Sequence, residues 1–579
     1  MRKTIGSAAR RLRFLLRHGL SANIRDYRRR RHLGEDQEPL KREYVRRLFS
    51  EAPEEVDPAP AASLKFSVIT PVYNTPESVL REMICSVREQ TWPCWELCLA
   101  DGSDGDHPWV QRICEEAAGA DPRVRYLRLR ENGGISGNSN AALAMATGEY
   151  LVLLDHDDRL MPDALREVAR CIRTQGADFI YSDEMIFASP DVSQVIGIRL
   201  KPDYAPDFLL SNNYICHLAA FDRRLLEKAG AFRPAYDGCQ DYDLFLRLTR
   251  AARKVAHIPR VLYLWRAIPG SVAAGIQEKD YVADAGRRAI HDFLRDSEGV
   301  ETEVAQTCPA MFRIRYPVSE HPSVRMIVEL QSAEKAAWES FRRRMAAEGI
   351  QTSAVRAGGK ARAEALGEAA AEATEDYLLF VQGIPEATDS AWVRELLMLA
   401  AREHVGAVGA RILTPENAVR HAGIVLGMGD RGLAGRPYYR MDGNSAGYFS
   451  QQAVVQNVSG VSCECMMVNR EKYEQTGGFD PGYRDSLFDL DLCLRLRELG
   501  YYNALTPFAV IRSGSETDFR FDFGEEYASY PEDAGRFRNR WDAALRRGDP
   551  FYHPDLSLRF EDWRLRSSTE TETGRKMEQ

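Results

Sequence analysis

The sequence predicts an α/β fold built around a doubly wound, mostly parallel sheet. From about residue 64, short apolar runs typical of buried strands alternate with segments whose apolar residues recur at helical spacing. The chain of 579 residues is too long for one ordinary core, so we expect two domains and an appendage. The runs that predict strands of the first sheet are residues 66–70, 95–100, 124–127 and 150–154.

The first predicted strand and helix show this alternation clearly. The strand from Phe66 to Thr70 is interrupted by Pro71. Thr75 and Pro76 then mark the start of a helix, because proline is well accommodated in a first helical turn. The apolar face predicted for this helix consists of Val79, Leu80, Met83, Ile84 and Val87.

Three carboxylates follow the fourth predicted strand. Asp155, Asp157 and Asp158 come directly after the apolar run at residues 150–154. Because like charges repel one another, a cation must lie among them or they must face water. Ligands of open α/β sheets bind beyond the carboxyl ends of the strands, which favours a divalent cation beside a phosphate-bearing substrate. The alternative is a solvated loop, with Asp158 or Asp163 near the start of the next helix.

Each predicted strand of this sheet ends in a polar turn. The turns are Pro71 to Asn74, Asp101, Asn132 to Asn140, and Asp155 to Asp158. The carboxyl ends of parallel strands meet at one edge of a sheet, and structural turns alone would not need so many carboxylates and amides together. The sequence therefore predicts a ligand-binding rim. It contains neither a G-x-G-x-x-G fingerprint nor a Walker lysine, so a dinucleotide site or a P-loop is not indicated.

Charge is distributed unevenly along the chain. Residues 1–50 contain fifteen Lys or Arg and five Asp or Glu, a net charge of +10, so the remainder carries −18 of the total of −8. A nucleic-acid partner would require basic folded domains, and these are acidic, so no nucleic-acid partner is expected. Eleven scattered cysteines indicate reduced thiols and a cytoplasmic protein.

The basic residues belong to an N-terminal arm, residues 1–63, which ends in a Pro/Ala linker at residues 53–63. Residues 1–31 have the pattern of a basic amphipathic helix. Such a helix either anchors the protein peripherally to an anionic membrane surface or packs on the acidic body of the protein itself. No apolar run approaches the roughly 18 residues that are needed to cross a bilayer.

A series of motifs in residues 64–295 carries a family resemblance. They are Pro71-Val-Tyr-Asn-Thr-Pro76, Glu96-Leu-Cys-Leu-Ala-Asp101, Asn132-Gly-Gly-Ile-Ser136 with Ser139-Asn140, Leu153-Leu-Asp-His-Asp-Asp158, Tyr214-Ile-Cys-His217, Gln240-Asp-Tyr-Asp243, and His257-Ile-Pro-Arg-Val-Leu-Tyr263 with Trp265-Arg266. In order and spacing they resemble the family 2 glycosyltransferases of bacterial polysaccharide synthesis, which have the GT-A fold. The resemblance implies an inverting enzyme that moves a sugar from a nucleotide-sugar donor to a glycan or lipid-linked acceptor.

The resemblance also implies roles for individual residues. Those implied to bind the donor are Pro71, Tyr73, Asn74, Asp101, Asn138, Asp155 and Asp157. Asp155 and Asp157 would form the D-x-D pair, with Asp157 closest to Mg²⁺ or Mn²⁺ on the diphosphate. Asp241 matches the catalytic base, although the residues alone favour a helix N-cap at this position. Trp265 and Arg266 would lie near the acceptor or the diphosphate.

Two positions depart from the family pattern. Gly102 stands where many members have a second aspartate, which leaves Asp101 as the carboxylate for the base or ribose. Leu264 stands where the family often has a histidine that helps to hold the metal or the diphosphate. This second departure puts the affinity for a metal, and the need for one, in question.

Residues 322–515 resemble a second, altered copy of the same fold. The predicted strand at Tyr377 to Val381 is followed by Gln382-Gly-Ile-Pro-Glu386 in place of acidic ligands, whereas later motifs such as Asp489-Leu-Asp-Leu-Cys match the family. We therefore expect a catalytic domain at residues 64–300, a degenerate, non-catalytic domain at 322–515, and a C-terminal tail at 516–579. The alternative function is an assembly protein that binds glycan or nucleotide sugar without turnover.

Overall fold

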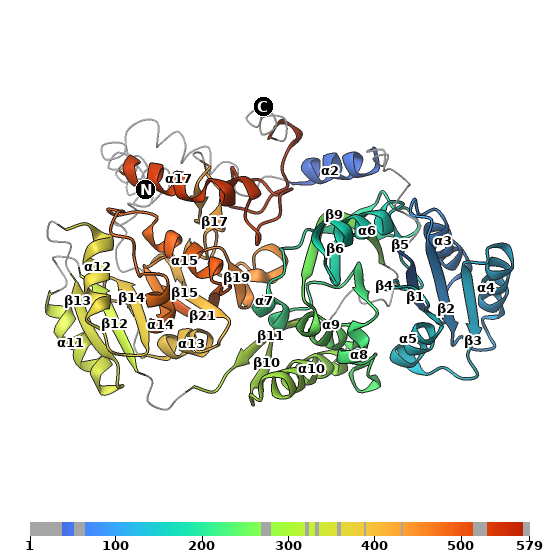
Figure 1. Ribbon diagram of the computed structural model, residues 1–579, viewed down its shortest axis with the longest axis horizontal. Helices are drawn as coiled ribbons and strands as arrows, with labels where there is room; N and C mark the ends of the chain where they lie inside the picture. The colour runs from blue at the N-terminus through green and yellow to red at the C-terminus, as the bar shows by residue number, and fades with distance from the viewer. Residues whose placement is uncertain are drawn as a thin grey trace, which may run out of the picture.

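The computed structural model describes residues 37–50, 64–267, 280–318, 323–330, 335–355, 360–386, 390–429, 432–512 and 530–570. The predicted helix at residues 1–31 and the linker at 53–63 lie outside these ranges. The described chain contains two mixed α/β sheets, drawn on the right and left of Figure 1. Within these ranges, no helix combines the length and apolarity needed to span a bilayer.

The first half of the first sheet agrees with the prediction. The strands are β1 (Phe66–Val72), β2 (Trp95–Asp101), β3 (Val124–Arg128) and β4 (Tyr150–Leu153), which lie parallel in the order β3-β2-β1-β4. Helices α3 (Glu77–Arg88), α4 (Pro108–Ala120) and α5 (Gly134–Met145) connect them. The predicted apolar face of α3 is buried. Helix α5 begins within the stretch 132–140 that the sequence predicted to be a turn.

The second half of this sheet is mixed. The sheet continues from β4 through β8 (Ala219–Asp222), β6 (Phe179–Ala188), β9 (Val255–Ala267) and β5 (Arg159–Leu160), with β7 (Val195–Arg199) beside β6. Strands β6 and β9 are parallel, and the other pairs are antiparallel, including β8 with both of its neighbours, β4 and β6. The prediction of a mostly parallel sheet is therefore wrong for this half. Antiparallel pairing needs no crossover helix, so strand and helix alternation does not reveal it.

The helices of this half of the domain are α6 (Ala164–Gln175), α7 (Pro206–Ser211), α8 (Leu225–Ala229) and α9 (Gln240–Ala251). After β9 come α10 (Asp280–Glu298) and the hairpin β10 (Glu303–Cys308) and β11 (Met311–Arg315), which lie between the two sheets in Figure 1.

The second sheet repeats the core of the first. Its strands are β13 (Gln351–Val355), β12 (Val324–Glu329), β14 (Tyr377–Gln382), β20 (Cys465–Asn469), β15 (Val405–Leu413), β21 (Tyr502–Arg512) and β19 (Gln456–Val458), in this order. The first six have the same neighbours and the same relative directions as β2, β1, β4, β8, β6 and β9. Its larger helices are α11 (Lys335–Ala347), α12 (Arg362–Ala371), α13 (Ala391–Ala400) and α15 (Phe488–Glu498).

The two halves of the chain share a core and a polar interface. One buried apolar cluster contains both Phe179 of β6 and Val408 of β15. Across the interface, the side chain of Asn457 donates to Asp207 Oδ2 (2.7 Å). After α17 (Pro531–Arg547), the C-terminal segment returns to the first half, where it lies beside α2 (Glu38–Ser50) at the top of Figure 1. The main-chain nitrogen of Ser568 donates to Glu43 there (2.9 Å).

Candidate functional site

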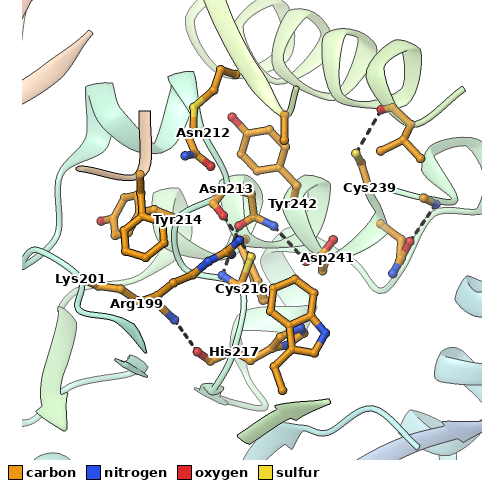
Figure 2. Close-up of a pocket in the computed structure, with 18 of the residues that line it drawn as sticks. Arg199, Lys201, Asn212, Asn213, Tyr214, Cys216, His217, Cys239, Asp241 and Tyr242 are labelled. Atoms are coloured by element: carbon orange, nitrogen blue, oxygen red, sulfur yellow. Dashed lines mark hydrogen bonds between the residues drawn. The ribbon is translucent and has the colours of Figure 1, made fainter. Parts of the chain in front are cut away.

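A cavity of about 850 Å³ lies at the carboxyl ends of β1 and β4. Pro71, Asp155, Asp157 and Trp265 line it from the first sheet, and Asp241 lines it from the start of α9. The hairpin β10–β11 and residues 448–451 complete its wall. The structure thus brings the predicted D-x-D pair and the predicted base to one cavity, part of which Figure 2 shows.

Asp158 differs from the other two carboxylates of the strand end. Its side chain is buried, and it accepts hydrogen bonds from the Tyr263 hydroxyl (2.6 Å) and the main-chain nitrogen of Arg266 (2.7 Å). Burial raises its pKa well above the usual range, and the charges of Asp157 and Asp155 add to the rise. Asp158 therefore fixes the loop to β9, and Asp155 and Asp157 are left to face the cavity.

Arg266 lies beneath the strand-end loop and does not line the cavity. Its side chain is only 1% exposed, its Nε donates to the carbonyl oxygen of Asp157 (2.7 Å), and its guanidinium pairs with Glu82 (2.7 Å). Arg266 is thus a buried support of the loop rather than part of the cavity wall, because the alternation of β9 turns neighbouring side chains to opposite faces. Trp265, the preceding residue, does line the cavity.

His217 is a cavity residue to which the sequence assigned no role. Its Nε2 lies 3.8 Å from Asp155 Oδ2, and its ring stacks on Tyr263 with 4.5 Å between ring centres. Its main-chain nitrogen donates to Glu184 Oε2 (3.1 Å). Leu264, where the family often has histidine, is buried in the core. An imidazole therefore reaches the strand end from the loop before β8 instead, and Tyr214-Ile-Cys-His217 was the signal for it.

The donor set at this strand end fits a divalent cation. Asp155, Asp158 and His217 offer ligand atoms that lie within 4.8 Å of one another. Because Asp158 is already engaged by Tyr263 and Arg266, we consider Asp155, His217 and the neighbouring Asp157 the available donors. Carboxylates suit Mg²⁺ and Mn²⁺, and imidazole also suits transition metals. Burial raises the pKa of Asp155, and the charge of Asp157 adds to the rise, so a cation would stabilise the ionised pair.

The other residues implied to bind the donor form a polar rim beside the cavity. Asp101 is buried and accepts from Ser103 N (2.8 Å), the Tyr126 hydroxyl (2.9 Å) and Arg128 (2.5 Å). The main-chain nitrogen of Asn74, whose φ of 49° is left-handed, donates to the Ser103 hydroxyl (2.9 Å). This network joins the ends of β1 and β2.

Tyr73 and Asn138 occupy two different environments in the same rim. Tyr73 is 43% exposed. Asn138 is buried in α5, where its side chain accepts from Gly133 N (3.0 Å) and donates to Asn132 (3.0 Å). A Cβ atom on Gly102 would approach the Asn138 side chain to 2.6 Å. An aspartate at position 102 would therefore clash with this asparagine, which accounts for the departure from the family pattern.

Asp241 lies in the first turn of α9 with its carboxylate on the cavity. Its Oδ2 accepts a hydrogen bond from the Asn213 side chain (2.9 Å), as Figure 2 shows. The residue that precedes the helix is Cys239, so Asp241 is not the N-cap that the residues alone suggested. Asp241 is close enough to Asp155 for its charge to contribute to the raised pKa of that residue.

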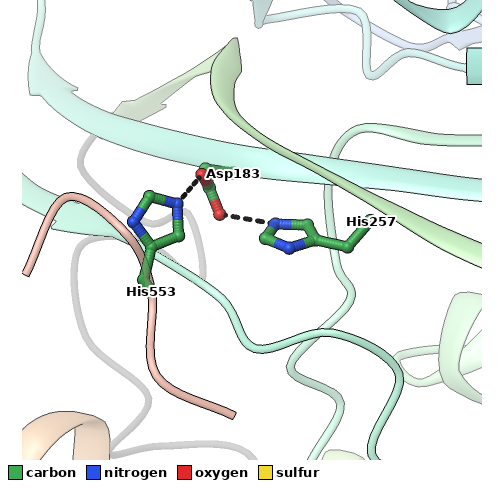
Figure 3. Close-up of side chains that lie close together, drawn as sticks. All are labelled: Asp183, His257 and His553. Atoms are coloured by element: carbon green, nitrogen blue, oxygen red, sulfur yellow. Dashed lines mark hydrogen bonds and ion pairs between the residues drawn. The ribbon is translucent and has the colours of Figure 1, made fainter. Parts of the chain in front are cut away.

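A second cluster of titratable groups lies away from the cavity. Asp183 of β6 accepts from His257 Nε2 (2.9 Å) and from His553 Nε2 (2.8 Å) of the C-terminal segment, as Figure 3 shows. Although these three residues could hold a metal by spacing, His553 Nδ1 accepts from Asp555 N (3.0 Å), so its Nε2 carries the proton. We interpret the cluster as a hydrogen-bonded tether between the C-terminal segment and the first sheet.

The fold and the cavity define an α/β domain with an acidic strand end suited to a cation and a phosphate-bearing ligand. Residues 67–229 match the family described as glycosyl transferase family 2. The chain therefore contains a family 2 glycosyltransferase domain.

Two curated relatives match most of this chain. The protein y4gI of Sinorhizobium fredii is 35% identical over 542 residues, which cover 86% of this chain and 58% of the relative. The O-antigen biosynthesis protein RfbC of Myxococcus xanthus is 31% identical over 548 residues, which cover 87% of this chain and 41% of the relative. The chain thus spans about half the length of these relatives.

Among solved structures, TarS 1-349 of S. aureus in complex with UDP-GlcNAc is similar with a TM-score of 0.32 and 18% identity, over 41% of this chain and 74% of that chain.

Proposed function

We propose that the protein is an inverting glycosyltransferase of bacterial surface polysaccharide synthesis, with a nucleotide sugar as donor and a glycan or lipid-linked saccharide as acceptor. One observation carries the proposal: the carboxylates of Asp155 and Asp157 and that of Asp241 line the same cavity. The leaving diphosphate needs a positive charge, and the attacking hydroxyl needs a base, so one cavity supplies both requirements.

The strand-end residues bind the diphosphate end of the donor. Asp155, Asp157 and His217 would hold Mg²⁺ or Mn²⁺, and the bound cation would supply the positive charge that the departing diphosphate needs. Arg266 and Asp158 position the loop from beneath through the carbonyl of Asp157 and the main chain of Arg266. Pro71, Tyr73, Asn74, Asp101 and Asn138 form the rim that receives the nucleoside.

Asp241 acts as general base on the opposite side of the anomeric carbon. It takes the proton from the acceptor hydroxyl as that oxygen bonds to the anomeric carbon. The bond from this carbon to the diphosphate oxygen breaks, and its electron pair leaves with the nucleoside diphosphate. A single displacement inverts the configuration. The hydrogen bond from Asn213 fixes the carboxylate in the orientation that accepts the proton.

We assign the chemistry to the domain at residues 64–300 and none to the domain at 322–515. The O-antigen description of the Myxococcus xanthus relative supports a role in surface polysaccharide. We place the protein in the cytoplasm or peripherally on the inner face of the cell membrane. The basic residues 1–31 are then available as the anchor to anionic lipid.

A donor screen tests the proposal. The full chain is incubated with UDP-, GDP- and dTDP-sugars, with and without Mn²⁺ or Mg²⁺, and release of the nucleoside diphosphate is measured. The proposal predicts metal-stimulated release from at least one donor, including slow transfer to water. Saturable donor binding with no release under any condition would instead favour the alternative, an assembly protein that binds without turnover.

A further inference from the structure

The second domain forms part of the cavity wall. The short helix η3 (Tyr448–Ala453) contributes Tyr448, Phe449, Ser450 and Gln451 to the same lining as Asp241 and Trp265. A domain without a strand-end metal site therefore still touches the space in front of the proposed base.

Tyr448 fixes this helix against the first domain. Its hydroxyl accepts from the main-chain nitrogen of Leu200 (3.1 Å) and lies 3.3 Å from the carbonyl oxygen of the same residue. Its ring stacks on Trp563 with 5.0 Å between ring centres. These contacts of Tyr448 hold the neighbouring residue, Phe449, at the cavity.

Phe449, the next residue, has an unfavourable backbone and an exposed ring. Its φ and ψ are 42° and 44°, and those of Ser450 are 60° and 20°. This left-handed region is unfavourable for residues with side chains, and such strain concentrates at ligand sites. The ring is 39% exposed. A strained backbone that presents a large apolar ring to the cavity indicates a ligand for that ring.

Arg199 lies between Phe449 and the aromatic residue of the first domain. Its guanidinium carbon is 5.5 Å from the centre of the Phe449 ring and 5.1 Å from that of Trp265. The same guanidinium donates a hydrogen bond from its Nη1 to Glu184 Oε1 (3.1 Å). Two aromatic faces from different domains therefore flank one fixed donor of hydrogen bonds, and the nearby side chains of Asn212, Asn213 and Gln451 are amides.

We propose that Phe449, Arg199 and Trp265 form a saccharide subsite for the acceptor, built across the two domains. The apolar face of a sugar ring would pack on Phe449, and the guanidinium of Arg199 would donate to its hydroxyls. A lipid chain would need a continuously apolar wall, which the amides interrupt, so the acceptor binds here through its sugars. This inference rests on the proposed function, because it places the acceptor beside Asp241.

Oligosaccharide binding by the full chain tests the subsite. Short oligosaccharides of rhamnose, mannose, glucose and N-acetylglucosamine are titrated by saturation-transfer NMR, in parallel with UDP and GDP in the presence of Mn²⁺. At least one oligosaccharide should bind saturably, and Phe449→Ala should weaken it about tenfold, since an aromatic contact contributes roughly a factor of ten. Phe449→Tyr keeps the ring and should retain binding.

Leu499→Ala is the matched control, because Leu499 is a 51% exposed apolar residue of the same domain outside the cavity lining. Leu499→Ala should change neither the affinity for oligosaccharides nor that for nucleotides. All variants should have the same midpoint of thermal unfolding. Wild-type affinity in Phe449→Ala, or no binding of any oligosaccharide by the wild type, would overturn the subsite. A wild type that binds neither UDP nor GDP would instead contradict the proposed function. The failure of the subsite and the failure of the proposed function are therefore distinguishable.

Discussion

The ends of β4 and β14 occupy the same place in two sheets of the same strand order, and their chemistry is opposite. Tyr150 pairs with Asp222 and Tyr377 pairs with Asn469. Counted from these pairs, Gln382 stands at the position of Asp155, Ile384 at that of Asp157, and Glu464 at that of His217. The two sheets thus share a strand order but carry different side chains at this strand end.

At this place the second sheet has internal ion pairs. Glu464 is buried and accepts from Arg420 (2.8 Å) and Arg436 (2.5 Å). Burial alone would raise its pKa, but the two guanidinium groups hold the pKa far below its usual range. The charge at this place therefore serves the stability of the domain, whereas in the first sheet the corresponding groups remain open to the cavity.

Each of the two domains has a carboxylate in the first turn of a helix, Asp241 in α9 and Asp489 in α15. Asp241 and Asp489 lie two residues before Asp243 and Asp491, which bond to Arg247 and Arg495 respectively (2.6 and 2.8 Å). Asp489 accepts from the main-chain nitrogens of Cys463 (3.0 Å) and Leu490 (2.9 Å). Asp241 lines the cavity, whereas the Asp489 carboxylate bonds to the main chain of its own domain.

The largest expected effect is on catalysis. Asp241→Asn and Asp157→Asn should each lower the rate of diphosphate release by about a thousandfold, because each removes a group that acts on the reacting atoms. Asp489→Asn is the matched substitution in the second copy and should keep the wild-type rate. Equal losses in Asp241→Asn and Asp489→Asn would show that the copies do not differ as described.

A second prediction concerns stability in the second copy. Glu464→Gln removes the negative charge that neutralises two buried guanidinium groups and should destabilise the protein by about 3 kcal/mol. His217→Gln, at the matching position of the first copy, should change the free energy of unfolding by less than about 1 kcal/mol, since its ring faces the cavity. Urea unfolding of both variants measures the difference, and equal stability losses would contradict the ion-pair account.

The cation donors give a third, smaller effect. His217→Gln should weaken the apparent affinity for Mn²⁺ roughly tenfold, as is usual when one supporting group of a metal site is lost. The rate at saturating Mn²⁺ should recover to near that of the wild type. Titration of activity with Mn²⁺ checks this, and an unchanged midpoint would remove His217 from the donor set.

The smallest effect is the pH dependence of the C-terminal tether. Burial by itself would lower the pKa of His257, but Asp183 outweighs it and raises the pKa. The contribution of His257 to stability is therefore complete below its pKa in the unfolded chain, about 6.5. This contribution is lost as the pH rises through the pKa of His257 in the folded protein. Asp183, whose pKa His553 and His257 lower against the effect of burial, stays ionised over this range.

Thermal unfolding between about pH 6 and pH 8 tests this assignment. The wild type should lose about 1 kcal/mol more than His257→Asn as the pH rises, because the variant lacks the titrating imidazole. Chelation of metals should leave both unfolding curves unchanged, since the cluster is closed by hydrogen bonds. Parallel pH profiles for the two proteins would contradict the raised pKa.

The sequence predicted the elements whose signal is local. The apolar runs gave β1 to β4, and the spacing of Val79 to Val87 gave the buried face of α3. The antiparallel strand β8 was missed because strand direction depends on pairing partners distant in sequence. The position of Asp155 and Asp157 on a cavity was predictable, because both follow a strand end of the sheet. The repulsion between these two carboxylates also requires a ligand or water beside them. The cavity position of Phe449 was not predictable, because this residue reaches the cavity only through tertiary structure.

The central claim, that one of the two copies carries the donor site, is tested most directly by the stoichiometry of nucleotide binding. Isothermal titration of the full chain with UDP, GDP or dTDP in the presence of Mn²⁺ should give one site per chain for at least one nucleotide. That site should be lost in Asp157→Asn and kept in Asp489→Asn. Two sites per chain, or a site that survives Asp157→Asn and disappears in Asp489→Asn, would contradict the account.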